Sequence, residues 1–122
     1  MVFLVVDSSP TRRRIVINSL KSLGYQDCME ANDGRDALVT LHTESIDFVI
    51  SEWAMETIDG LELATYIRTD EELERLPILL ISSKTNKEEI VEAMKAKVSN
   101  YLVRPFTLEA LKEKIETIIF LT

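Results

Sequence analysis

The sequence predicts an α/β protein with a doubly wound, five-stranded parallel sheet, built as five successive strand–helix units, (βα)5. Two observations predict this fold. Short apolar runs alternate with segments that carry helix-start and helix-stop residues. The runs are also apolar throughout, as in strands that helices cover on both faces. The length of 122 residues fits a single domain, which we expect to span residues 1–122.

The expected elements follow one another in strict alternation. The predicted strands cover residues 2–6, 28–31, 48–50, 78–81 and 101–103. Each following helix has its own start signal: Ser8 to Pro10, Asn32 or Asp33, Asp59 with Gly60, the capping-box spacing of Thr85 and Glu88, and Thr107. Gly24 is expected to close the first helix. In the fourth helix, the spacing predicts a buried stripe of Val91, Met94 and Val98.

Composition excludes several functional classes. Acidic residues outnumber basic ones by 21 to 14, and the net charge of −7 argues against nucleic-acid binding. A single cysteine, Cys28, and a single histidine, His42, allow neither a disulfide nor an ordinary zinc site. No apolar run reaches the ~20 residues of a membrane span. We therefore expect a cytoplasmic protein without a nucleic-acid or membrane partner.

The predicted strands end on polar residues that should meet at one edge of the sheet. Asp7 and Glu52 end the first and third strands, Ser82 ends the fourth and Arg104 the fifth. One such residue is commonplace, since strands end where they reach water, but four at one edge indicate a site. Two converging carboxylates repel unless Mg²⁺ or a cation such as Arg104 balances them.

The turn after the first strand argues against most nucleotide sites. It contains no glycine, whereas dinucleotide-binding and P-loop turns require one. The run Ser8-Ser9-Pro10-Thr11 leaves a flavin phosphate loop as an alternative, although a helix start explains it more simply. The run Arg12-Arg13-Arg14 is interpreted as a solvated helix face that could also steer an acidic partner.

Several stretches together resemble a known family: Phe3–Asp7, Thr11–Val16, Phe48–Ser51 with Trp53, Asp59–Leu63 and Tyr101–Thr107. Over nearly the whole chain they resemble the response-regulator receiver domain of two-component signalling, whose fold is CheY-like and flavodoxin-like. The resemblance implies an aspartate at the end of strand three that accepts a phosphoryl group from a histidine kinase. It also implies a protein partner, either that kinase or a downstream target in a pathway such as chemotaxis.

The resemblance assigns roles to positions of this sequence. The phosphoacceptor position is Glu52, and the metal ligands are Asp7, Glu52 and the carbonyl of Ala54. The switch residues are Ser82, Tyr101 and Arg104, and the Arg104–Pro105 peptide is expected to be cis. The partner face implied by the family comprises Ile90, Ala93, Tyr101, Val103 and Lys114.

Three of the family's phosphorylation residues are replaced. Glu52 stands for aspartate, Ser8 for the second acid and Arg104 for lysine, while Lys97 replaces the glycine that ends helix four. We therefore expect Mg²⁺ binding to be weak or absent, with Glu52 paired to Arg104 and projecting charge toward Ser82 in partial imitation of a phosphorylated aspartate.

These departures favour a phosphorylation-independent pseudo-receiver that acts as a monomeric adaptor by protein–protein contact and is not an enzyme. The alternative is a phosphoryl-accepting receiver that uses Mg²⁺ and Glu52 in a phosphorelay.

Overall fold

The computed structural model describes residues 1–121. Five parallel strands form one sheet in the order β2-β1-β3-β4-β5. The strands are β1 (Val2–Val6), β2 (Asp27–Ala31), β3 (Phe48–Glu52), β4 (Ile78–Ser82) and β5 (Asn100–Val103). The helices are α1 (Pro10–Ser22), α2 (Gly34–Thr43), α3 (Gly60–Thr69), α4 (Lys87–Lys95) and α5 (Leu108–Leu121). One helix follows each strand, so the predicted (βα)5 fold is confirmed. Within residues 1–121, no helix is long and apolar enough to cross a membrane.

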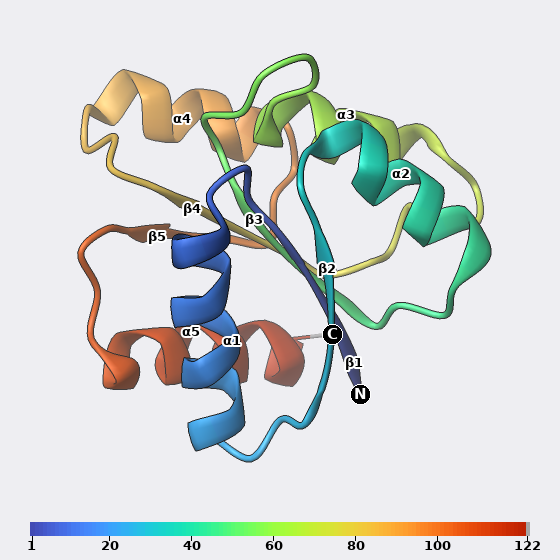
Figure 1. Cartoon of the computed structure of the whole chain (residues 1–122). Helices are drawn as coiled ribbons and strands as arrows, with labels where there is room; N and C mark the ends of the chain where they lie inside the picture. Colours follow the sequence, from blue (N-terminus) through green and yellow to red (C-terminus); the bar gives the residue numbers. More distant parts are fainter. Residues whose placement is uncertain (122) are drawn as a thin grey trace.

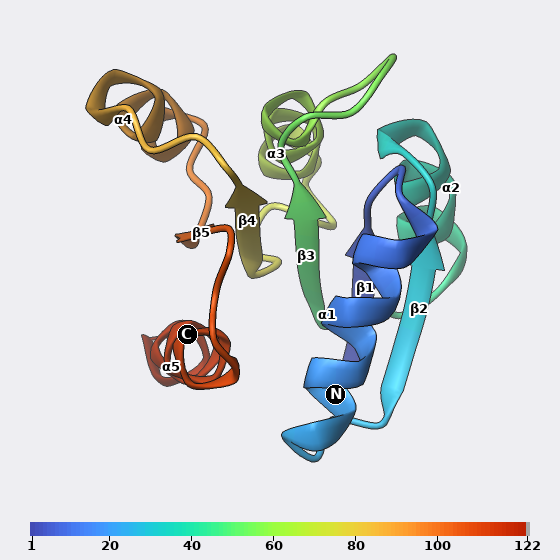
Figure 2. The ribbon, with the colours of Figure 1, turned by 60° about the vertical axis from the view of Figure 1, so that its left-hand side comes forward.

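Helices cover both faces of the sheet. Helices α1 and α5 lie on one face, and α2, α3 and α4 lie on the other (Figures 1 and 2). Alternate residues of β1 follow this division: Phe3 and Val5 pack in the cluster beneath α1 and α5, whereas Leu4 and Val6 pack on the opposite side. The continuous apolar runs of the sequence therefore reflect two buried faces.

The same alternation sets the direction of the two acidic residues at the strand ends. Phe3 and Val5 point toward α1 and α5, and Asp7 continues that series. In β3, Phe48 and Ile50 point to the same side, and Glu52 follows them. Because Val6 pairs with Ser51, Asp7 and Glu52 come to the same level of neighbouring strands. Both carboxylates therefore lie on the side of the sheet that α1 and α5 cover.

Gly60 lets the start of α3 pack closely against the end of β3. A Cβ atom at this position would lie 2.5 Å from the carbonyl oxygen of Glu52 and 2.9 Å from the Cα of Trp53. Only a residue without a side chain permits this approach. The Gly60 amide also donates to the carbonyl of Trp53 at 2.8 Å, so the turn after Glu52 is held in one position.

Most predicted helix ends are confirmed, but α4 differs in two ways. Its cap is Asn86, whose side chain accepts from the Glu88 amide, and not Thr85. Of the predicted buried stripe, only Val98, which follows the helix, is buried, whereas Val91 and Met94 are 44% and 48% exposed. Ala93 is fully buried instead. The helix is rotated about its axis so that the small side chain of Ala93 faces the sheet, and this allows α4 to pack close to the sheet.

Lys97 adopts the left-handed conformation expected where a glycine is replaced, with a φ of 62°. Its carbonyl accepts a hydrogen bond from Arg68 Nε at 2.8 Å. The same guanidinium donates to the carbonyl of Leu76 at 2.6 Å. Arg68 thus holds the end of α3, the approach to β4 and the turn after α4 together. Its burial lowers the pKa of its guanidinium.

Replacing Lys97 by glycine should stabilise the fold. The exposed Lys97 side chain makes the positive φ unfavourable, and Lys97→Gly should raise the free energy of unfolding by about 0.5–1 kcal/mol in urea denaturation. Glu92→Gly, at an exposed position inside α4, is the matched control and should lower it by about 1 kcal/mol. A destabilising Lys97→Gly would show that the lysine side chain itself supports this turn.

Candidate functional site

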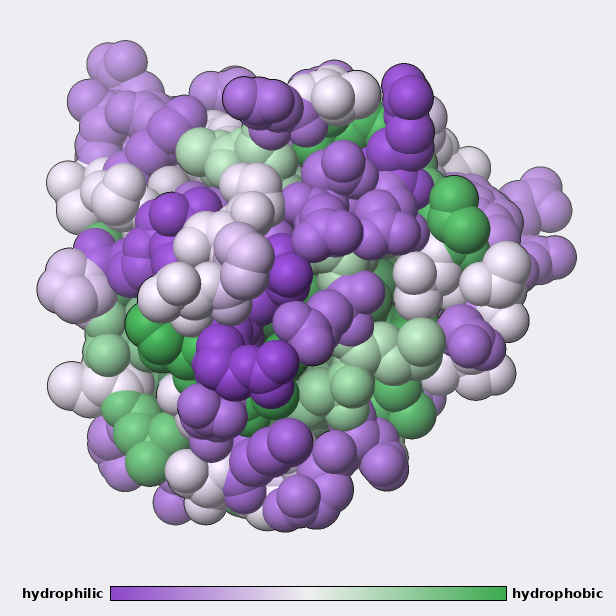
Figure 3. All heavy atoms as spheres, in the orientation of Figure 1, coloured by the Kyte–Doolittle hydropathy of each residue, from purple (hydrophilic) through white to green (hydrophobic). Residues whose placement is uncertain are grey.

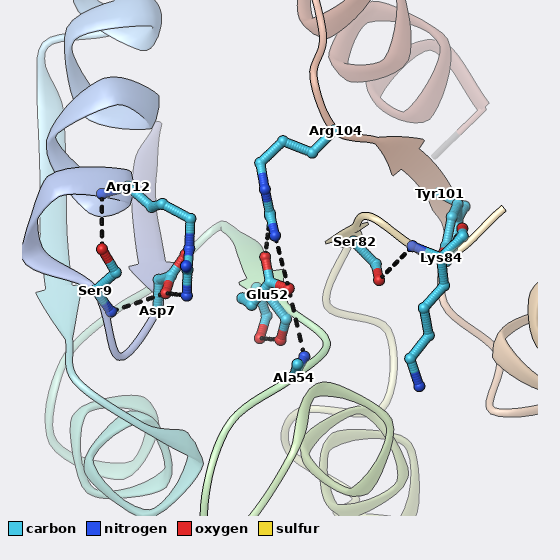
Figure 4. Close-up of polar contacts among 10 residues, drawn as sticks. Asp7, Ser9, Arg12, Glu52, Ala54, Ser82, Lys84, Tyr101 and Arg104 are labelled. Atoms are coloured by element: carbon cyan, nitrogen blue, oxygen red, sulfur yellow. Dashed lines mark hydrogen bonds and ion pairs between the residues drawn. The ribbon is translucent and has the colours of Figure 1, made fainter.

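Asp7 is held by hydrogen bonds to both of its carboxylate oxygens. Arg12 Nε donates to Oδ2 at 2.9 Å, and Arg12 Nη2 donates to Oδ1 at 2.7 Å. The Ser9 amide also donates to Oδ1 at 2.9 Å. This is the bidentate geometry in which guanidinium–carboxylate pairs are strongest. Figure 4 shows Arg12 reaching down from α1 onto the carboxylate.

Glu52 is held in a similar way by Arg104, which follows β5. Arg104 Nη1 pairs with Oε2, and Nη2 donates to Oε1 at 3.3 Å. The amide of Ala54, an exposed residue, donates to Oε1 at 3.4 Å. The structure therefore contains the predicted Glu52–Arg104 ion pair, and the Arg104–Pro105 peptide is cis as expected.

The position of Arg12 follows from the way α1 begins. Ser9 is the N-cap, and its side chain accepts from the Arg12 amide. Pro10 and Thr11 form the start of the first turn, so Arg12 is the third helical residue and its side chain turns back toward the end of β1. Arg13 Nη1 donates to the Asp7 carbonyl at 2.6 Å.

The interpretation of the arginine run as a solvated face is therefore wrong for two of its three members. Arg12 pairs with Asp7, and Arg13 pairs with Glu30 at 3.0 Å in addition to binding the Asp7 carbonyl. Only Arg14 remains mainly exposed. Two arginines of α1 are thus used within the molecule, because the helix starts directly beside the acid that ends β1.

The two ion pairs line a small, mainly apolar cavity between the sheet and α1. This cavity of about 40 Å³ is lined by both pairs and by aliphatic side chains that include Val5, Val6, Ile15, Val16, Ile50 and Ile81. Asp7 and Glu52 expose 7% and 3% of their side chains. The hydrogen bond to Asp7 raises the pKa of Arg12, and the charge of Glu52 raises it further. Shielding from water strengthens such charge pairing.

Ser82 and Tyr101 form a second group of contacts on the other side of the sheet. The Tyr101 hydroxyl donates to the carbonyl of Lys84 at 2.7 Å, and the Lys84 amide donates to Ser82 Oγ at 3.1 Å. Burial raises the pKa of Tyr101. Both residues thus hold the backbone that follows β4.

The expectation that Glu52 projects toward Ser82 is wrong. Both Glu52 oxygens are directed to Arg104, as Figure 4 shows. Arg104 bears a positive charge and can reach across from the end of β5, whereas a serine hydroxyl offers a single weaker donor. The ion pair therefore determines the direction of the carboxylate.

Lys84 contacts the aromatic side of this second group. Its ammonium lies 4.0 Å from the centroid of the Trp53 ring and 3.3 Å from Glu89. Trp53 is buried and meets the Tyr101 ring edge-on at 6.1 Å. The ammonium therefore lies over an aromatic ring and beside a carboxylate of α4, where it stabilises the loop before that helix.

The oxygen ligands at this edge do not fit a Mg²⁺ ion. Mg²⁺ prefers near-octahedral coordination by carboxylates and water. The carboxylate oxygens of Asp7 and Glu52 already accept from guanidinium groups, and Ser8 supplies no carboxylate. Among residues 1–121, no three His, Cys, Asp or Glu side chains are grouped so that they could hold a metal ion.

Comparisons with known proteins agree with this architecture. A family model described as the response regulator receiver domain matches residues 3–116. The chain is 42% identical to the chemotaxis protein CheY of Pseudomonas aeruginosa, over 97% of this chain and 95% of that protein. It is 45% identical to CheY-3 of Vibrio cholerae, over 97% and 91% of the respective chains. The chain belongs to the response-regulator receiver family.

Solved structures of response regulators also match this chain. The Vibrio cholerae chemotaxis protein CheY4 is 29% identical to this chain, with a TM-score of 0.88 and coverage of 97% and 98%. A response regulator receiver protein from Pseudomonas putida is 32% identical, with a TM-score of 0.86 and coverage of 95% of both chains. The chain is thus a receiver domain of two-component signalling.

The partner face expected for this receiver is only partly accessible. Ile90, Val103 and Lys114 are half-buried at the surface. Ala93 is wrong as a contact residue because it is fully buried, and Tyr101 is 7% exposed. The exposed apolar residues of α4 are Val91 and Met94, for which the sequence predicted a place in the core.

Arg12 and Lys84 make contacts in this receiver that the helix and strand patterns of its sequence do not predict. A usable signal for Arg12 existed: an arginine three residues after a helix cap, where the preceding strand ends on an acid. For Lys84 no comparable signal exists, since its contact with Trp53 depends on how two loops meet in space.

Removing Arg104 should destabilise the receiver. Arg104→Met leaves the almost fully buried Glu52 carboxylate without its counter-charge, and we expect a loss of about 3 kcal/mol in urea denaturation at neutral pH. Adding Glu52→Gln should recover part of the loss, because it removes the unpaired charge. Arg14→Met, at a mainly exposed arginine, should change stability by less than about 0.5 kcal/mol. Equal effects of Arg104→Met and Arg14→Met would contradict this account.

Proposed function

We propose that this receiver works without phosphorylation and acts as an adaptor through protein–protein contact, not as an enzyme. The observation that carries the proposal is the ion pair between Glu52 and Arg104. Glu52, the residue at the acceptor position, is therefore already paired with a cation from the receiver's own chain.

Phosphorylation of a carboxylate requires a free oxygen placed in line with the transferring phosphorus. Arg104 engages both oxygens of Glu52, and the glutamate carries them about 1.5 Å farther out than an aspartate would. Displacements of this size severely reduce the rate of in-line transfer. The proposal includes weak or absent Mg²⁺ binding, which would remove the charge stabilisation on which such transfer depends.

The second group of contacts supports a constant signalling surface. Tyr101 is buried with its hydroxyl on the Lys84 carbonyl, and Ser82 accepts from the amide of the same residue. Neither contact involves Glu52. In this proposal the loop before α4 keeps its arrangement whatever the phosphodonor concentration, and a partner binds the receiver in that state.

The surface of α4 and β5 is the contact region that we propose for a protein partner. Val91 and Met94 add apolar area there, next to the half-buried Ile90 and Val103. Figure 3 shows a face of the molecule that is mostly hydrophilic, with apolar areas between polar residues. The proposal includes a monomer in the cytoplasm that does not bind nucleic acid, and the net charge of −7 supports the last point. The names of the chemotaxis relatives support a role in that type of pathway.

Intact-mass spectrometry after incubation with acetyl phosphate and Mg²⁺ tests the proposal. The wild-type receiver should gain no phosphoryl group. The variant carrying Ser8→Asp, Glu52→Asp and Arg104→Lys restores the three residue types of the family, and Arg12→Met in the same protein frees Asp7 from its ion pair. This variant should gain one phosphoryl group under the same conditions. This variant controls for the donor and for the lability of the product. A phosphoryl group mapped to Glu52 of the wild type would overturn the proposal and favour the phosphorelay alternative.

A further inference from the structure

We infer that Arg12 is a built-in cation, which takes the place of a divalent metal at Asp7 and excludes such metals from this edge of the sheet. This inference rests on the proposed function, because it names what keeps the site in its constant state. Arg12 is a positioning residue in this account: it acts by holding Asp7.

The contacts of Asp7 leave little room for another ligand. A carboxylate offers about four lone-pair positions in total. Three are used by Arg12 Nε, Arg12 Nη2 and the Ser9 amide, at distances between 2.7 and 2.9 Å. The one remaining position is on Oδ2, which already accepts from Arg12 Nε, so a metal ion bound there would lie beside the positive guanidinium.

The charges at this edge of the sheet also disfavour the binding of a divalent cation. The two carboxylates, Asp7 and Glu52, are matched by the two guanidinium groups of Arg12 and Arg104. A divalent cation at this place would meet no net negative charge and two positive neighbours, all beside an apolar cavity. In such surroundings, like charges repel more strongly than they do in water.

Arg12 differs in this respect from Arg14, the exposed arginine of the run. Arg14 lies two residues further along α1 and is mainly exposed, and its nearest acidic partner is Glu30 at 3.8 Å. Arg14 therefore offers a matched control on the same helix, with the same charge and without a contact to Asp7.

The experiment uses Ser8→Asp to supply the missing second carboxylate and measures Mn²⁺ binding from the electron paramagnetic resonance signal of the free ion. Three proteins are compared: S8D, S8D with R12M, and S8D with R14M. S8D with R12M should bind Mn²⁺ at least about tenfold more tightly than S8D alone. S8D with R14M should bind like S8D. Equal affinities of the R12M and R14M double variants would overturn the inference.

Folding is checked by circular dichroism and urea denaturation of each variant. If the R12M double variant does not fold, Arg12→Gln in the same background replaces it, because glutamine keeps a hydrogen-bond donor for Asp7 and loses the charge. The R12Q double variant should also bind Mn²⁺ more tightly than S8D, and equal binding would overturn the inference.

The outcome is separate from that of the phosphorylation test. If the wild type remains unphosphorylated while Arg12 has no effect on Mn²⁺ binding, the inference on Arg12 fails and the proposed function stands. If Glu52 of the wild type is phosphorylated, the proposed function fails.

Discussion

The arrangement of this receiver depends on the pairing of two buried carboxylates with two guanidinium groups. Asp7 and Glu52 end neighbouring strands at the same level, and each would be costly to bury alone. Arg12 approaches from α1 and Arg104 from the end of β5, so the cations come from the two segments that flank this edge. The result is a neutral cluster over an apolar cavity, formed entirely by the receiver's own chain.

The sheet explains why those two segments supply the arginines. Alternation along β1 and β3 directs Asp7 and Glu52 to the side that α1 and α5 cover. Gly60 then allows α3 to close against the Glu52 carbonyl, which fixes the end of β3 from the opposite side. A one-residue slip of β1 or of β3 would send the carboxylate of that strand to the other face, where the rings of Trp53 and Tyr101 lie.

Features that depend on chain order and on strand ends can be predicted from the sequence. The (βα)5 order, the edge that gathers Asp7 and Glu52, and the Glu52–Arg104 pair all follow from which residues end which strands. Features that depend on the rotation of a helix or on tertiary contacts cannot be predicted in this way. The buried face of α4 is set by how closely Ala93 approaches the sheet, and periodicity alone favoured Val91 and Met94. The helical pattern alone predicts a solvated Arg12, because its partner Asp7 precedes the helix and does not lie on it.

An arginine and a metal ion differ in one respect that matters for signalling. A metal ion or a phosphoryl group conveys information because it comes and goes, and its effect on the switch follows its occupancy. A guanidinium on the same chain, such as that of Arg12 or Arg104, is always present. Under the proposed function, the carboxylates that these two arginines hold therefore do not report a varying input. The variable quantity in that proposal is the binding of a protein partner to the surface near α4 and β5, and the two ion pairs keep that surface in one state.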